Sequence, residues 1–284
     1  MPDTGRSALQ TVSRHSCEDL QWSEVSRQIA FAATGEIAVC EWVAECVSVF
    51  DSSYRHLRSF GNTGPEERKL HTPLGVAISS DNTVFVAARH CVKKFTLEGQ
   101  FTASVGTHGS GRLQFRTPWA IAYNGTNNKV YVCDTFNHRI TILNHDLTFH
   151  GSFGSRGSDP GQFYSPTGIS VHIKGNVVVA DRDNNRIQVF DASGHFLSAI
   201  THTMSGQQLQ GPISVSVGPD NCVYVLEEFS YRVSIFDHTG KYIKSFGKEG
   251  DKDGEFGGAY GVAVSDEGYV YVSDTDNHRI QVFK

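Results

Sequence analysis

One short apolar strand ending recurs at nearly equal intervals along the whole chain. Successive copies are separated by 45, 48, 47, 46 and 47 residues. A fixed period of this length is typical of repeat proteins, whose units stack so that neighbours bury a shared core. The repeat therefore constrains the fold more than any single residue does. The six copies are centred on Phe50, Phe95, Leu143, Phe190, Phe236 and Phe283.

Each copy predicts four short strands. Within a copy, Pro opens a strand and a large apolar residue stands three residues before it; Pro fits there because the first residue of a strand need not donate to the ladder. In the fourth copy we expect strands at 168–173, 176–180, 186–191 and 196–200. Six such units covering each other radially predict an all-β fold, a six-bladed β-propeller of four-stranded antiparallel blades. The marker pairs are Leu70 with Pro73, Phe115 with Pro118, Phe163 with Pro166, and Leu209 with Pro212, while Phe256 is followed by Ala259.

The same spacing predicts how the ring closes. The sixth copy stops at Lys284, after its third strand, and in four copies a Gly stands nine residues before the apolar marker. In the first copy Trp22 takes the place of the apolar marker, because Gln21-Trp22 matches Gln114-Phe115. Counting nine residues back from Trp22 places an outer strand at 8–12, so segment 1–14 is expected to complete the last blade. The chain is then one propeller domain over 1–284. The expected blades span 22–61, 70–106, 115–154, 163–201, 209–247 and 256–284.

Three copies share the spacing Asp–x–x–Asn–x–Arg at the turn between the second and third strands. Asp and Asn side chains bond nearby backbone N–H groups, Asn tolerates the left-handed conformation, and an Arg fork can hold a carboxylate. We interpret these positions as a structural turn motif. The first copy has Glu41 and Cys46 at the Asp and Arg positions, the fifth has Glu227 and keeps Arg232, and the second reads one residue shorter. The complete motifs are Asp134, Asn137 and Arg139; Asp181, Asn184 and Arg186; and Asp274, Asn277 and Arg279.

With this motif in phase with the period, the chain resembles the NHL repeat, as in the C-terminal propellers of tripartite-motif (TRIM) ubiquitin ligases. The resemblance covers essentially the whole chain, whereas no Trp-Asp dipeptide supports a WD-repeat propeller. It implies a module that recruits protein substrates or RNA in a TRIM-NHL-like ubiquitin-ligase system. The chain carries no Cys/His-rich zinc module, so we expect no enzyme activity of its own.

Metal catalysis is the least favoured alternative. Some propellers with NHL-like repeats are zinc-dependent lyases, and such a site needs several His converging on the central channel. The inner strands begin at Leu74, Trp119, Thr167, Ile213 and Tyr260, none of them His. We therefore expect no catalytic residue, no metal and no cofactor. Six Cys without a CxxC pair indicate free thiols in a reducing compartment and a cytoplasmic location.

The distribution of charge favours a protein partner over a nucleic acid. The net charge is −5, and the loops and turns expected on one face of the propeller are together net negative, which disfavours a broad phosphate-binding surface. Our leading prediction is a non-catalytic scaffold that binds a protein through this face; the alternative is single-stranded or hairpin RNA bound by a basic sector of blades 2 and 3. We expect no DNA, no membrane and a monomer. The candidate partner-binding residues are Arg89, His90, His108, Arg112, Arg116, Trp119, Phe136, His138 and Trp42.

Overall fold

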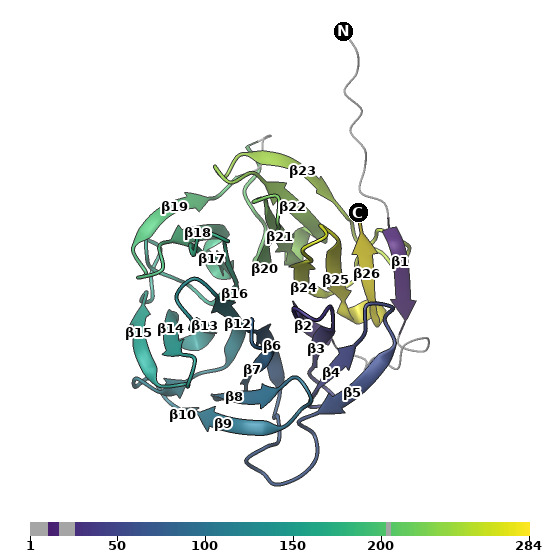
Figure 1. Ribbon diagram of the computed structural model, residues 1–284. Coiled ribbons are helices and arrows are strands. Elements are labelled where there is room, and N and C mark those ends of the chain that lie inside the picture. The colour runs from purple at the N-terminus through teal and green to yellow at the C-terminus, as the bar shows by residue number, and fades with distance from the viewer. Residues whose placement is uncertain (1–10, 17–25, 203–205) are drawn as a thin grey trace.

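The computed structural model describes residues 11–16, 26–202 and 206–284. Figure 1 shows six sheets arranged as blades around a central channel, in the order of the chain. Each sheet has four antiparallel strands, and the innermost strand of each faces the channel. This confirms the all-β six-bladed propeller expected from the repeat.

In the first three blades the strands run outward in sequence order. Blade 1 contains β2 (Ser26–Phe31), β3 (Ile37–Glu41), β4 (Cys46–Phe50) and β5 (His56–Phe60). Blade 2 contains β6 (Pro73–Ile78), β7 (Thr83–Ala88), β8 (Cys91–Thr96) and β9 (Phe101–Val105). Blade 3 contains β12 (Pro118–Asn124), β13 (Lys129–Asp134), β14 (Arg139–Asn144) and β15 (Phe149–Phe153). The loop before blade 3 adds a short parallel pair, β10 (Thr107–His108) with β11 (Gln114–Phe115).

Blades 4 and 5 repeat the same arrangement. Blade 4 contains β16 (Pro166–Val171), β17 (Val177–Asp181), β18 (Arg186–Phe190) and β19 (Phe196–Ile200). Blade 5 contains β20 (Pro212–Val217), β21 (Val223–Glu227), β22 (Arg232–Phe236) and β23 (Tyr242–Phe246). Single 3₁₀ turns join the second and third strands of four blades: η1 (Thr135–Asn137), η2 (Arg182–Asn184), η3 (Glu228–Ser230) and η4 (Thr275–Asn277).

Blade 6 combines strands from opposite ends of the sequence. Its β24 (Ala259–Val264), β25 (Val270–Asp274) and β26 (Arg279–Phe283) are followed outward by β1 (Thr11–Ser16), which runs antiparallel to β26. Figure 1 shows β1 beside β26. Of the outer strand expected at 8–12, residues 11 and 12 lie in β1, and the rest falls outside the described residues, as does Trp22.

The markers read from the sequence have clear places in the blades. Pro73, Pro118, Pro166 and Pro212 are the first residues of their inner strands, as expected. The four strands expected in the fourth copy lie within two residues of the observed bounds. The spacing of the repeat markers was therefore sufficient to place the strands, although it did not give the residues at which each strand begins and ends.

The core is divided among the blade interfaces. Six apolar clusters of buried side chains lie between successive blades, and one of them joins blade 6 to blade 1 through Tyr271 and Phe50. Each blade buries both of its faces against its neighbours, which a single four-stranded sheet cannot do alone.

A Gly and a large apolar side chain meet at the edge of four interfaces. Gly154 has φ +90°, and a Cβ at this position would collide with the ring of Phe163, which is fully buried. Gly61, Gly106 and Gly247 face Leu70, Phe115 and Phe256 in the same way. The nine-residue spacing in the sequence therefore reflects a close approach that only Gly permits.

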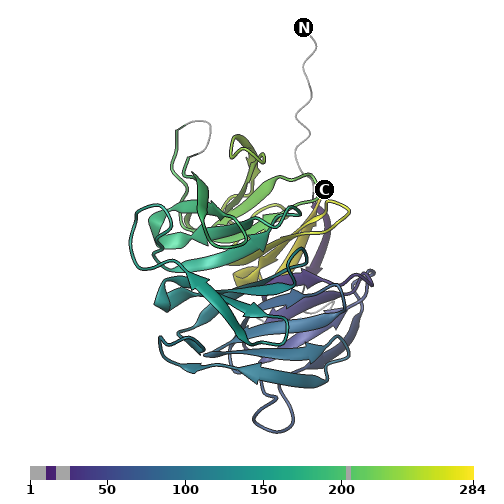
Figure 2. The ribbon, with the colours of Figure 1, turned by 60° about the vertical axis from the view of Figure 1, so that its left-hand side comes forward.

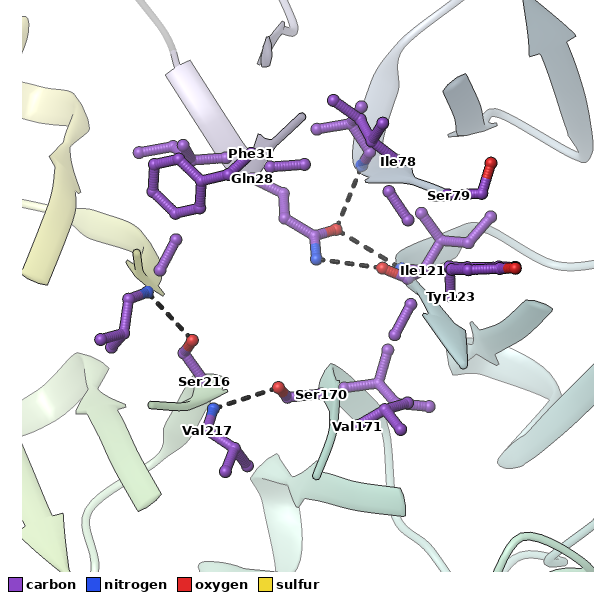
Figure 3. Close-up of a pocket in the computed structure, with 18 of the residues that line it drawn as sticks. Gln28, Phe31, Ile78, Ser79, Ile121, Tyr123, Ser170, Val171, Ser216 and Val217 are labelled. Carbon is purple, nitrogen blue, oxygen red and sulfur yellow. Dashed lines mark hydrogen bonds between the residues drawn. The ribbon is translucent and has the colours of Figure 1, made fainter. Parts of the chain in front are cut away.

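Polar side chains link the inner strands around the channel (Figure 3). The Gln28 side chain accepts a hydrogen bond from the Val76 N–H and donates one to the Ile121 carbonyl, so it joins blade 1 to blades 2 and 3. The Ser170 hydroxyl accepts from the Val217 N–H, and Ser216 accepts in the same way from blade 6. These contacts occupy backbone groups at strand edges that would otherwise face the channel. One end of the channel opens into a cavity of about 410 Å³.

Candidate interaction surface

The turns between second and third strands lie against the loops that lead into the inner strands. The Phe136 N–H donates to the Arg116 carbonyl, and the Asp183 N–H donates to the Tyr164 carbonyl. These turns and inter-blade loops together form one face of the propeller, which we call the loop face. Its geometry is determined mainly by the turn motif.

In blade 4 the turn motif forms a network around a fully buried carboxylate. The Asp181 carboxylate accepts hydrogen bonds from Asn184 Nδ2 and Arg186 Nε, both at 2.8 Å, and from the Tyr164 N–H at 2.7 Å. The guanidinium also donates to carbonyls of the preceding inter-blade loop, at Ser158, Asp159 and Gln162. A third-strand amide, Gln188 Nε2, donates to the same carboxylate at 3.1 Å. The network therefore fixes the loop to the blade, and we call it the turn clamp.

Blade 6 carries the same turn clamp, and blade 3 carries it with Thr141 in place of the third-strand amide. Arg139 Nε and Arg279 Nε lie 2.9 and 2.6 Å from the carboxylates of Asp134 and Asp274. Blade 5 carries a variant in which Arg232 Nε lies 2.8 Å from Glu227. One expectation needs correction: the left-handed residue of each turn is not the motif Asn but the residue after it. These residues are His138, Asn185 and His278, with φ of 53°, 51° and 51°.

Blade 2 has no turn clamp. Ala88 pairs directly with Cys91, so the turn has two residues where blade 3 has four between Asp134 and Arg139. The copy is thus two residues shorter than the complete motif, not one as expected. At the third-strand position occupied by Gln188 in blade 4, blade 2 places Lys93, which is 7% exposed and donates to the Glu67 carbonyl at 2.6 Å.

The predicted basic sector lies on the loop face at blades 2 and 3. Arg89, Arg112 and Arg116 are exposed, and none of them forms an ion pair with another described residue. The rings of His90 and His108 are in contact, with centroids 4.6 Å apart. Burial lowers the pKa of His90, and the charge of His108 lowers it further. The structure thus brings two of the five basic residues into contact and leaves the three arginines open to solvent.

His138 is engaged in a contact between blades. Its Nδ1 accepts a hydrogen bond from the Ser165 N–H at 3.1 Å, and its ring packs against Tyr164. In blade 4 the Asn185 side chain accepts from the Gly211 N–H in the equivalent position. Burial lowers the pKa of His138, with Arg156 adding to the effect. The neutral ring is therefore the form that accepts the bond.

A half-buried cation at the centre of the loop face was not expected from the sequence. Arg27, at the start of the inner strand of blade 1, lies 3.8 Å from the ring centroid of Tyr260 and within 6 Å of those of Trp42 and Trp119. Burial is the largest cause of its lowered pKa. Arg27 stands in register with Leu74 of blade 2, because Ile29 and Val76 pair equivalently with their second strands. Extending the inner-strand alignment to blade 1 would have found it.

Exposed aromatic side chains surround this centre. Trp42 is 39% exposed, Phe136 50%, Tyr164 40% and Phe229 61%, and all four lie on turns or loops of the loop face. Arg156 and Arg182 lie over the rings of Tyr164 and Phe229, at 5.3 and 5.4 Å. Trp42 and Phe136 were expected from the sequence, whereas Tyr164 and Phe229 were not.

Within the described ranges, no group of three or more His, Cys, Asp or Glu side chains is placed to hold a metal ion. The same ranges contain no helix long and apolar enough to cross a membrane. Five cysteines of the described residues are free thiols: Cys40, Cys46, Cys91, Cys133 and Cys222.

Six four-stranded blades around a channel, with turn clamps at a fixed position of the repeat, define a repeat-type β-propeller. The family model of the NHL repeat matches residues 115–143, 163–190 and 256–283, which are the three blades with a complete turn clamp. Three blades of this six-bladed β-propeller therefore carry NHL repeats, and the chain resembles the propellers of TRIM-NHL proteins.

Two relatives and one solved structure illustrate the range of similar proteins. Protein brain tumor of Drosophila melanogaster is 32% identical over 144 residues, which are 50% of this chain and 13% of that protein. NHL repeat-containing protein 3 of Mus musculus is 30% identical over 202 residues, covering 65% of this chain and 55% of that protein. The chain thus spans little more than half of one relative and a small part of the other. A streptogramin B lyase structure shares the fold, with a TM-score of 0.65 and 13% identity over 98% of this chain and 96% of that chain.

Proposed function

We propose that this propeller is a non-catalytic scaffold that binds a protein partner through its loop face, as the substrate-recognition module of a TRIM-NHL-like ubiquitin-ligase system in the cytoplasm. The observation that carries the proposal is the set of exposed aromatic side chains on that face. Aromatic residues and Arg dominate the binding energy of protein interfaces, and rigid scaffolds present such residues on loops. Here Phe136 and Phe229 are the most exposed of them.

Affinity capture from lysate tests the proposal with two matched variants. Phe136→Ser/Phe229→Ser removes the aromatic rings from the loop face, whereas Leu57→Ser/Leu197→Ser removes exposed apolar side chains from the outer strands β5 and β19. We expect the wild type and the outer-strand variant to retain a partner after nuclease treatment, and the loop-face variant to lose it. Equal retention by both variants, or loss of the partner on nuclease treatment, would contradict protein binding through this face.

RNA binding is the second candidate, favoured by the three exposed arginines of the basic sector. Each Lys or Arg contact with a phosphate releases counterions, so about three contacts predict a clear decrease of affinity with rising salt. Replacing Arg89, Arg112 and Arg116 by Glu should abolish binding of a single-stranded or hairpin RNA probe and the salt dependence with it. An affinity that does not change with salt concentration would remove this candidate.

A further inference from the structure

Blade 2 departs from the other blades in charge as well as in length. In blades 3 to 6 a carboxylate is fully buried at the end of the second strand: Asp134, Asp181, Glu227 and Asp274. Blade 2 has Ala88 in that position, since Ala88 pairs with Pro73 as Asp181 pairs with Pro166. Ala88 therefore stands where a turn clamp has its carboxylate.

The groups that would face such an acid are still present. In blade 4 the carboxylate accepts from Gln188 on the third strand and from the N–H two residues before the inner-strand Pro. The equivalent groups in blade 2 are Lys93 and the His71 N–H, and no carboxylate of the described residues accepts from either. Lys93 has a carbonyl as its acceptor, so its positive charge is buried without a counter-charge.

A small cavity opens at this place on the loop face. Its volume is about 170 Å³, and it is lined by Lys69, His71, Arg89, His90, Cys91 and Lys93. Cys91 takes the position of the clamp Arg, so no guanidinium fills the space. Lys69 and His71 belong to the loop that joins β5 to β6, which projects away from the ring in Figures 1 and 2.

The nearby acids do not neutralise the cavity. Glu66, whose side chain is 70% exposed, lies 3.3 Å from Lys69 and also pairs with His71. Glu45, whose side chain is 43% exposed, lies 3.4 Å from the other ring nitrogen of His71, so both acids are at the rim. Arg89 and Lys93 have no ion pair with a described residue. Burial raises the pKa of Cys91, so the thiol stays neutral and contributes no negative charge. The interior therefore favours an anion.

We propose that the blade 2 cavity binds a carboxylate side chain, Asp or Glu, of an acidic segment in the protein partner, which completes the missing turn clamp from outside. This inference rests on the proposed function, because it identifies the chemistry of the partner on the loop face. A bound carboxylate oxygen would accept from Lys93 Nζ and from the His71 N–H, as the Asp181 carboxylate accepts from Gln188 and Tyr164 in blade 4. The cavity volume suits one side chain rather than a larger ligand.

The test uses three variants of the full chain that each change the net charge by −1. Ala88→Asp supplies the acid within the chain, Lys93→Gln restores the blade 4 residue, and Lys252→Gln removes an exposed lysine elsewhere on the loop face. The probes are fluorescent hexaglutamate, hexaglutamine and hexauridylate, followed by anisotropy at low salt. We expect hexaglutamate to bind, and Ala88→Asp and Lys93→Gln each to weaken it tenfold or more, as loss of a charged hydrogen bond predicts. Lys252→Gln should change the affinity less than threefold.

Several results would overturn the proposal. The first is that all three variants weaken hexaglutamate binding equally, and the second is that hexaglutamine binds as tightly as hexaglutamate. The third is hexauridylate binding that depends equally on Lys93, which would assign the cavity to a nucleic-acid phosphate. Thermal unfolding shows whether Ala88→Asp is folded, and Lys93→Gln decides the outcome if it is not. Partner capture separates the two proposals. If only Phe136→Ser/Phe229→Ser abolishes capture, the cavity takes no part in partner binding. If the cavity binds carboxylate and Phe136→Ser/Phe229→Ser leaves capture unchanged, the exposed aromatic side chains take no part in it.

Discussion

Blades 4 and 2 have the same four-stranded architecture, but they hold their inter-blade loops in different ways. Both bury an apolar side chain against a Gly of positive φ, Phe163 against Gly154 and Leu70 against Gly61. Only blade 4 adds the turn clamp, in which Asp181 is bound by an amide, a guanidinium and a backbone N–H. The comparison separates two functions of the repeat: the apolar interface builds the blade, and the turn clamp fixes the loop.

The largest effect is expected where a complete turn clamp loses its acid. Asp181→Ala removes the carboxylate that Arg186 Nε and Gln188 Nε2 share, so the guanidinium keeps only carbonyl acceptors and loses its counter-charge. Breaking a buried pair in this way costs about 3–5 kcal/mol of unfolding free energy. Urea denaturation measures the loss. The exposed Asp183→Ala, on the same turn, should cost less than about 1 kcal/mol.

A double variant tests whether blade 4 can be converted to the composition of blade 2. Asp181→Ala/Arg186→Cys should lose less stability than the sum of its single variants, because the cation that lacks a partner is removed with the acid. Additive losses would show that Asp181 and Arg186 act independently, and the account of the turn clamp as one unit would then be wrong.

Blade 2 should respond in the opposite direction when its buried charge is removed. Lys93→Met replaces an ammonium without a counter-charge by an apolar chain of similar length, so the unfolding free energy should be unchanged or rise by up to about 2 kcal/mol. The same urea denaturation measures it. A loss of more than about 2 kcal/mol would mean that the bond from Lys93 to the Glu67 carbonyl fixes the loop as strongly as a turn clamp does.

The smallest effect concerns the contact between blades 3 and 4, and it depends on pH. His138 accepts from the Ser165 N–H in its neutral form, and its pKa is lowered by burial, so the unfolded chain binds the proton more tightly. The stabilisation is therefore present above about pH 6.5 and is lost as the pH falls through the lower pKa of the folded state. His138→Asn, which copies Asn185, should keep the bond and lose this dependence.

Thermal unfolding of the wild type and His138→Asn between pH 8 and pH 5 measures the difference. At pH 8 the two proteins should agree within about 0.5 kcal/mol, the usual range for a tolerated substitution. Parallel pH curves for the two proteins would show that His138 does not titrate with folding.

The sequence predicted the architecture well because the signals that build blades are periodic. Pro at the first residue of an inner strand and Gly nine residues before Phe163 are local requirements of backbone and packing, so they recur at readable intervals. The Asp–Asn–Arg spacing predicted a turn held by side chains. Its wider role, in which Arg186 donates to carbonyls of the preceding loop, depends on residues 24 to 28 positions away, and spacing alone does not indicate it.

The candidate site was less predictable because it forms where the repeat is irregular. Arg27 was missed because blade 1 lacks the Pro that marks four of the inner strands, so its register was not followed to the channel. The blade 2 turn was misjudged by one residue because only the pairing of Ala88 with Cys91 reveals its length. His138 was named for partner binding. It shares its motif position with Asn185, but the hydrogen bond that each side chain accepts from the next blade is apparent only in three dimensions.

The polar links around the channel have a consequence for self-association. The inner edge of a sheet is a row of backbone donors and acceptors that can pair with a strand from another molecule and begin aggregation. Here the side chains of Gln28, Ser170 and Ser216 bond the N–H groups of neighbouring inner strands. A strand from another molecule that entered the channel would have to displace these side chains. The inner strand edges are therefore protected from pairing between molecules, and the propeller is protected from polymerising through its centre.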